Sequence, residues 1–115
     1  MTTILITGAS GLIGNLLVHE LKSRYTVIAM SRSAPDGQGF TYVRGDFACW
    51  EDLALLDQYQ IEGVVHLAAV TGGCLEREGI LVNVEGTRTL IQYLAGRGCK
   101  KFVLASSIAA IGFQN

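Results

Sequence analysis

The sequence predicts an α/β fold, a doubly wound parallel sheet of five strands in the order 3-2-1-4-5. Two observations lead to this prediction. Short apolar segments alternate with segments of helical periodicity, and the apolar segments are those of strands covered on both faces. Alternation of this kind implies parallel strands joined by right-handed crossovers. Residues 1–115 are enough for one domain of ordinary size, and we expect no second domain.

The strands are expected where the residues are β-branched or apolar throughout, at 3–7 (TILIT), 26–30 (TVIAM), 41–43 (TYV), 63–69 (GVVHLAA) and 101–106 (KFVLAS). The first helix follows the first strand directly, in LIGNLLVHELKSR. Its leucines and isoleucine recur with helical spacing, so we expect one stripe to face the sheet. That stripe consists of Leu12, Ile13, Leu16, Leu17 and Leu21.

Two further helices are expected between the later strands. The segment 50–59 (WEDLALLDQY) predicts a helix whose Leu53, Leu56 and Tyr59 face inward. A longer helix is expected from about 78 to 95, ended by the two glycines that follow it. Periodicity alone is equally typical of a small α/β domain with no binding or catalytic site. Only the glycines and the hydroxyl-bearing residues can indicate whether such a site exists.

Composition narrows the class of protein. Nine basic and ten acidic residues give a net charge of -1, which removes the electrostatic reason to expect binding to nucleic acid or to an anionic membrane. The amino terminus lacks the features of a signal peptide, and no apolar run approaches the roughly 18 residues of a membrane span. We therefore expect a cytoplasmic protein. Cys49, Cys74 and Cys99 show no CxxC pairing, and we expect free thiols and no metal site.

Three glycines follow the first strand in ILITGASGLIG (4–14). Glycine is required where φ is positive or where a phosphate or another backbone comes too close for a Cβ atom. We expect Gly8 to make the turn, Gly11 to let a pyrophosphate approach, and Gly14 to let the helix pack closely on the sheet. Glycines that serve only a tight turn are the alternative interpretation.

Backbone and hydroxyl donors surround these glycines. A helix that begins at Leu12 and Ile13 presents N–H groups and the positive end of its dipole to a diphosphate. Thr7 and Ser10 can add hydroxyl donors. We therefore expect the segment from the end of the first strand to the start of the helix to bind the phosphates of a dinucleotide.

The end of the second strand reads AMSRS (29–33). NAD-binding folds normally carry an acid here, about 20 residues after the glycines, which accepts a hydrogen bond from the ribose 2′-hydroxyl. Ser31 and Arg32 can instead bind a 2′-phosphate, and the first carboxylate, Asp36, already lies in the loop. This pattern favours NADP(H) over NAD. If Arg32 is only a solvated loop cation, the preference stays open.

Five segments in order resemble the extended short-chain dehydrogenase/reductases, the family of NAD(P)-dependent nucleotide-sugar epimerases and dehydratases. The resemblance covers nearly the whole chain and implies a Rossmann-type fold with an NAD(P) site and a small-molecule substrate. It is carried by TGASGLIG (7–14), GDF (45–47), HLAA (66–69), NVEGT (83–87) and FVLASSIAAIG (102–112).

The resemblance also implies roles for residues at the ends of the third and fourth strands. Asp46 would accept a hydrogen bond from the adenine amino group, and Phe47 would lie beside the ring. Leu67, Ala68 and Ala69 would pass under the cofactor, where small side chains leave room for it.

Ser107 matches the serine of the family that binds the substrate hydroxyl or carbonyl, and Ser106 is the weaker match. Asn83, a poor helix former within a predicted helix, either bonds across to a neighbouring strand or, as the resemblance implies, helps to order the backbone and a water molecule of the active site. A serine pair that only ends the strand is the alternative. His66 is expected as a packed strand residue rather than a base, and Gly86 as a point of close contact between helix and sheet.

The family's proton-transferring YxxxK pair is missing from this chain. All four tyrosines precede Ser107, and none has a lysine four residues later. The chain is therefore interpreted as the NAD(P)-binding portion of an oxidoreductase that lacks the later strands and the substrate region. The alternative is a noncatalytic nucleotide-binding or interaction module. An uncovered apolar flank beside the fifth strand would favour a homodimer.

Overall fold

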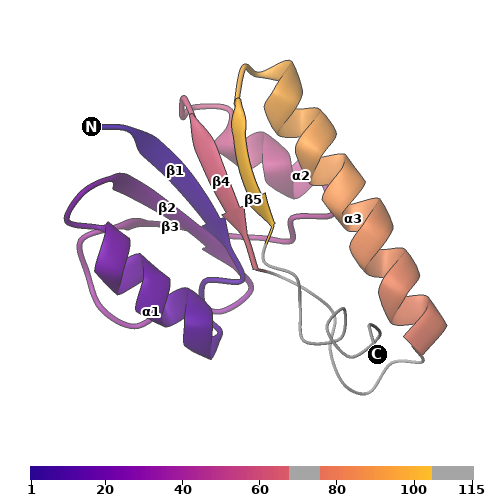
Figure 1. Ribbon diagram of the computed structural model, residues 1–115, viewed down its shortest axis with the longest axis horizontal. Helices are drawn as coiled ribbons and strands as arrows, with labels where there is room; N and C mark the ends of the chain where they lie inside the picture. The colour runs from indigo at the N-terminus through magenta and orange to yellow at the C-terminus, as the bar shows by residue number, and fades with distance from the viewer. Residues whose placement is uncertain (68–75, 105–115) are drawn as a thin grey trace.

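The computed structural model describes residues 1–67 and 76–104. One sheet of five parallel strands runs through the molecule in the order β3-β2-β1-β4-β5, which confirms the predicted topology (Figure 1). The strands are β1 (Thr3–Thr7), β2 (Thr26–Ser31), β3 (Thr41–Arg44), β4 (Gly63–His66) and β5 (Lys101–Leu104). β4 ends earlier than predicted, at His66, and residues 105 and 106 of the predicted fifth strand lie outside the described residues.

Helices cover both faces of the sheet (Figure 1). α1 (Leu12–Leu21) packs on one face, and α2 (Trp50–Leu53) and α3 (Glu76–Gly96) pack on the other. α2 continues as a short 3₁₀ helix, η1 (Ala54–Leu56), so the second predicted helix is shorter and tighter than expected. Within the described residues no helix is both long and apolar enough to cross a bilayer.

The side chains of β1 alternate between two cores, because successive residues of a strand point to opposite faces. Leu5 belongs to the core under α2 and α3, together with Leu53, Leu56 and Leu90. Ile4 and Ile6 belong to the core under α1, with Val18. Ile4 is 8% exposed, and the other six of these side chains are fully buried.

The predicted apolar stripe of α1 is wrong in three of its five positions. Leu12, Ile13 and Leu16 are 81%, 62% and 63% exposed. The buried face consists instead of Gly14, Leu17, Val18 and Leu21, which also recur at helical spacing. Because Gly14 has no side chain, α1 can approach the backbone of Gly8 and Ala9 closely, and the side of the helix that carries Gly14 makes the contact.

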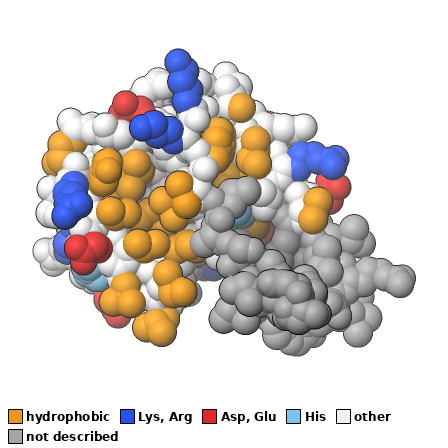
Figure 2. Space-filling view, viewed as in Figure 1, with side chains coloured by type: hydrophobic (Ala, Val, Ile, Leu, Met, Phe, Trp, Pro, Cys, Tyr) orange, Lys and Arg blue, Asp and Glu red, His pale blue; other side chains and the backbone are white. Residues whose placement is uncertain are grey.

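Exposed apolar side chains gather on the face that carries α1 (Figure 2). Besides the three on α1, Val103 of β5 is 57% exposed. Cys49 and Cys99 are free thiols, as predicted, and Cys74 lies outside the described residues.

Candidate functional site

The turn from β1 to α1 is compact and depends on its first glycine. Gly8 has a φ of 69°, a backbone conformation that residues other than glycine rarely adopt. Its carbonyl oxygen accepts the N–H of Gly11 at 3.1 Å. Gly11 is the N-cap of α1, with φ -73° and ψ 172°, and its carbonyl accepts the N–H of Asn15 at 2.8 Å. The chain thus reverses at Gly8 and enters the helix after Gly11.

The other two glycines of the turn stand in different surroundings. A Cβ atom on Gly14 would lie 2.1 Å from the carbonyl oxygen of Gly8 and 2.7 Å from Cα of Ala9, both backbone atoms. The close contact therefore lies between helix and turn, not between helix and sheet as predicted. A Cβ atom on Gly11 would meet only the Gly8 oxygen, at an ordinary 3.5 Å. Nothing in the described chain requires glycine at position 11.

The first turn of α1 presents backbone donors at the surface. The first N–H groups of a helix have no partner within the helix, and they carry the positive end of its dipole. No side chain caps this end, and Ser10, Leu12 and Ile13 are exposed. These donors can hold an anion such as a phosphate.

Thr7 lies beneath the turn rather than on its surface. The side chain is 1% exposed, and its Oγ1 lies 2.6 Å from Nδ1 of His66. The same oxygen accepts the N–H of Leu67 at 3.1 Å. Both contacts join the Thr7 hydroxyl to β4 and to the residue after it, and the donation of this hydroxyl to a ligand stays a prediction.

His66 is a packed strand residue, as predicted, but it is also hydrogen-bonded on both sides. Its Nε2 lies 3.0 Å from Oγ1 of Thr87 on α3. The ring of Phe47 packs edge-on against it, with 4.6 Å between the ring centroids. Burial lowers the pKa of His66 from 6.5 to about 4, so the ring is neutral near pH 7.

The carboxyl ends of β2 and β3 bring two other predicted site residues together. Arg32 Nη2 lies 3.3 Å from Oδ2 of Asp46, and the arginine side chain is 83% exposed. Asp46 is fixed by two further bonds: its N–H donates to Oδ2 of Asp52 at 2.7 Å, and its Oδ1 accepts the N–H of Ala48 at 2.9 Å. Ser31 is buried and donates to the carbonyl of Ser33 at 2.6 Å.

Sequence reasoning missed Asp52, which holds the loop after β3. It also misplaced the contact of Gly86. A Cβ atom there would lie 2.8 Å from Cε2 of Phe47 and 3.0 Å from Cβ of Ala48, so α3 meets the 47–48 segment and not the sheet. The absence of a side chain at position 86 leaves room for the Phe47 ring.

Four predicted site residues lie where the structure does not describe them. Ala68, Ala69, Ser106 and Ser107 fall outside the described residues, and Asn83 lies on α3 with its side chain not described. Among residues 1–67 and 76–104, no three His, Cys, Asp or Glu side chains are grouped to hold a metal ion.

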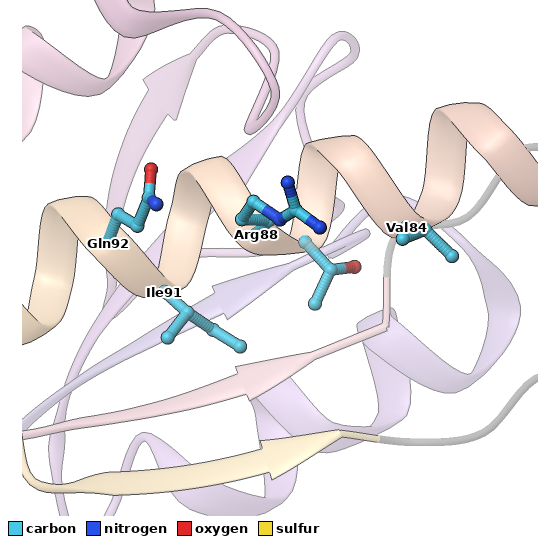
Figure 3. A pocket seen from close by; sticks show the side chains of 5 residues that line it. Val84, Arg88, Ile91 and Gln92 are labelled. Carbon is cyan, nitrogen blue, oxygen red and sulfur yellow. The ribbon is translucent and has the colours of Figure 1, made fainter.

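A shallow hollow of about 510 Å³ lies along α3 (Figure 3). It is lined by Val84, Thr87, Arg88, Ile91 and Gln92. All five side chains come from one helix, and the lining is almost entirely apolar. Only Thr87 connects this hollow with the residues under the glycine turn, through its bond to His66, among the contacts of the described lining residues.

A parallel sheet in this order, with a glycine turn that leads into its first helix, defines a Rossmann-type protein. The comparison with protein families is more specific. The chain belongs to the NAD dependent epimerase/dehydratase family, whose model matches residues 4–114.

Two curated relatives match almost all of this chain. A chloroplastic divinyl chlorophyllide a 8-vinyl-reductase of Cucumis sativus is 32% identical over 93% of the chain. A dTDP-glucose 4,6-dehydratase of Streptomyces antibioticus is 31% identical over 95% of the chain. The chain spans only 29% and 38% of the lengths of these two proteins.

Solved structures give the same result. A short-chain dehydrogenase/reductase superfamily protein from Agrobacterium tumefaciens, with bound NAD, superposes with a TM-score of 0.77 and 31% identity, covering 91% of this chain and 32% of that protein. The UDP-glucose 4-epimerase of Thermus thermophilus in complex with NAD gives 0.80 and 25%, covering 92% and 38%. Both proteins are about three times as long as the segment that matches.

Proposed function

We propose that this chain binds the pyrophosphate of a nicotinamide dinucleotide on the turn between β1 and α1. The observation that carries the proposal is Gly11. Its backbone conformation suits any residue, and a Cβ atom would have room, yet the position is glycine beside exposed helix N–H groups. A ligand that approaches the backbone closely accounts for that choice, and a diphosphate suits the positive end of the helix.

The adenosine part would extend toward the carboxyl ends of β3 and β4. Asp46 is held at the end of β3 by its N–H, which donates to the Asp52 carboxylate, and by its own carboxylate, which accepts the N–H of Ala48; this suits a carboxylate that accepts from the adenine amino group. Phe47 would lie beside the adenine ring. Leu67, Ala68 and Ala69 would pass under the dinucleotide. Ligands of open parallel sheets bind at this edge.

NADP(H) is the proposed cofactor, and Arg32 is the reason. Its ion pair with Asp46 is long at 3.3 Å, and the guanidinium is largely exposed. An exposed pair of this kind contributes about 1 kcal/mol at most. A 2′-phosphate offers the same guanidinium a doubly charged partner, so exchange is favourable. Ser31 contributes less than predicted, because its hydroxyl is buried and already donates to Ser33.

In its complete form the protein would be an oxidoreductase of the epimerase/dehydratase type. The dehydratase and epimerase among its relatives are named for nucleotide sugars, which supports a nucleotide sugar or a related carbonyl compound as the substrate. When bound, the nicotinamide supplies hydride transfer. Ser107 would bind the reacting oxygen of the substrate, and Asn83 would order the backbone of the site. Acid/base groups would come from outside these 115 residues.

Titration with NADPH, NADH and ADP tests the proposal. The parent chain should bind all three saturably, NADPH most tightly. Gly11→Val should weaken each of them at least tenfold, because its side chain occupies the place of the pyrophosphate. Gly96→Val is the matched control, since a Cβ atom there meets nothing within 4 Å. If the parent chain binds none of the three, the proposal is wrong and a noncatalytic interaction module is favoured.

A further inference from the structure

Three polar side chains form a continuous line beneath the glycine turn. Thr7, His66 and Thr87 are joined by contacts of 2.6 Å and 3.0 Å. They come from β1, β4 and α3, with a sequence separation of 59 residues between Thr7 and His66 and of 21 between His66 and Thr87. Thr7 and His66 face each other as register partners at the carboxyl ends of neighbouring strands. The line therefore runs from the centre of the sheet to the helix that covers it.

Filling space does not explain a histidine at this position. The side chain is 6% exposed, and burial of a polar ring is costly unless its nitrogens are hydrogen-bonded. A leucine would fill a similar volume without that requirement. Both ring nitrogens have partners, and within the described residues no buried side-chain nitrogen or oxygen lacks one. His66 therefore joins β4, on which it lies, to β1 and α3 through hydrogen bonds.

One end of the line reaches the turn directly. Thr7 precedes Gly8, whose carbonyl oxygen accepts the N–H of Gly11. The Thr7 hydroxyl oxygen also accepts the N–H of Leu67, the first residue after β4. A displacement of Thr7 is therefore transmitted both to the Gly8–Gly11 turn and to the segment proposed to pass under the dinucleotide.

We propose that His66 is a positioning residue of the nucleotide site: it locks Thr7, and with it the Gly8–Gly11 turn, onto Thr87 of α3. The proposal rests on the proposed function, since that turn is the proposed pyrophosphate site. His66 acts without touching the ligand. Its edge contact with Phe47 means that the same ring also steadies the aromatic residue proposed to lie beside adenine.

The test uses the end of the line that is farthest from the turn in sequence. Thr87→Val removes one hydroxyl and keeps the shape of the side chain. Thr89→Val makes the same change on the same helix, where the hydroxyl donates only to the carbonyl of Glu85 among the contacts described for it. For each variant we would measure the Kd of NADPH, the free energy of unfolding in urea, and the ¹⁵N–¹H resonance of the Gly11 amide.

Thr87→Val should raise the Kd of NADPH about three- to tenfold, the effect of one hydrogen bond, and should move the Gly11 resonance. Thr89→Val should do neither. His66→Leu should act in the same direction, and Thr7→Ser should recover most of the affinity that Thr7→Val loses. A destabilised Thr87→Val that binds NADPH with the parent Kd would show a merely structural role and overturn the proposal.

The two proposals fail in different ways. If the parent chain binds none of NADPH, NADH and ADP, the proposed function is wrong, and the Gly11 resonance then decides the positioning role. A resonance that moves in Thr87→Val but not in Thr89→Val supports it. A resonance that stays fixed in both variants overturns it.

Discussion

The two later glycines of the turn should separate fold from binding. We predict that Gly14→Ala damages the fold, whereas Gly11→Ala leaves the fold intact and weakens nucleotide binding. The new methyl group at position 14 would stand 2.1 Å from one backbone atom and 2.7 Å from another. Neither atom can rotate away as a side chain could. Relief requires that α1 move off the turn.

The expected magnitudes follow from these contacts. Overpacking costs about 1–3 kcal/mol, and backbone contacts belong at the upper end of that range. Alanine is about 1 kcal/mol more favourable than glycine inside a helix, which leaves a loss of about 2 kcal/mol for Gly14→Ala. At Gly11 the methyl group meets its nearest atom at 3.5 Å, in a conformation that alanine adopts freely. A weaker N-cap and a stiffer unfolded chain offset each other there, within about 0.5 kcal/mol.

Urea unfolding, followed by circular dichroism, and titration with ADP measure both effects. With a slope of about 1–3 kcal/mol per molar urea, Gly14→Ala should unfold at about 1 M less urea than the parent. Gly11→Ala should unfold with the parent and bind ADP at least tenfold more weakly. A Gly14→Ala variant with the parent midpoint would refute the packing argument, and a Gly11→Ala variant with the parent affinity would refute the assignment of position 11 to a ligand.

Three other predictions concern single side chains. Arg32→Ala should weaken NADPH binding about tenfold and leave NADH within about twofold, because only the 2′-phosphate needs the guanidinium; equal losses for both would contradict the NADP preference. The pKa of His66 falls from 6.5 to about 4 on folding, because burial disfavours the charged ring. The stability that depends on the neutral ring is therefore fully present above pH 6.5 and is lost as the pH falls through 4, since the unfolded chain binds the proton first. The loss amounts to about 3 kcal/mol, at about 1.36 kcal/mol per pH unit, and urea midpoints of His66→Leu should lack this component. Tyr93→Phe removes a 2.6 Å bond to Asp57, and should cost about 1 kcal/mol in the same assay with NADPH binding unchanged.

The sheet could be predicted because its signals are local and repeat along the chain. Continuous apolar runs marked every strand, and the handedness of parallel crossovers supplied the order. The stripe of α1 failed for a physical reason. Counting large apolar residues selected Leu12, Ile13 and Leu16, but the helix packs through Gly14 and Val18, where a missing side chain brings the backbones together. A glycine can belong to the buried face of a helix, and a search for leucines overlooks it.

The candidate site could be predicted only in part. Motif spacing predicted the turn and Arg32, and the family resemblance predicted Asp46, but neither says which side chains face each other. The ion pair between those two residues and the support from Asp52 appear only in three dimensions. One signal was available for the buried line. The predicted order makes the first and fourth strands neighbours, and each of these segments carries a polar residue, Thr7 and His66, which the structure places at the strand ends.

The backbone and the polar side chains around the turn have different roles. The surface of the turn consists of glycine, helix N–H groups, Ser10 and exposed apolar residues, whereas the polar side chains of Thr7 and His66 are buried. The proposed phosphate site would therefore bind its ligand mainly through main-chain N–H groups. Substitutions of exposed Leu12 or Ile13 should therefore disturb binding less than Gly11→Ala does, and less than the loss of a hydroxyl that no ligand touches. Affinity then depends on how firmly the residues underneath hold the backbone in place.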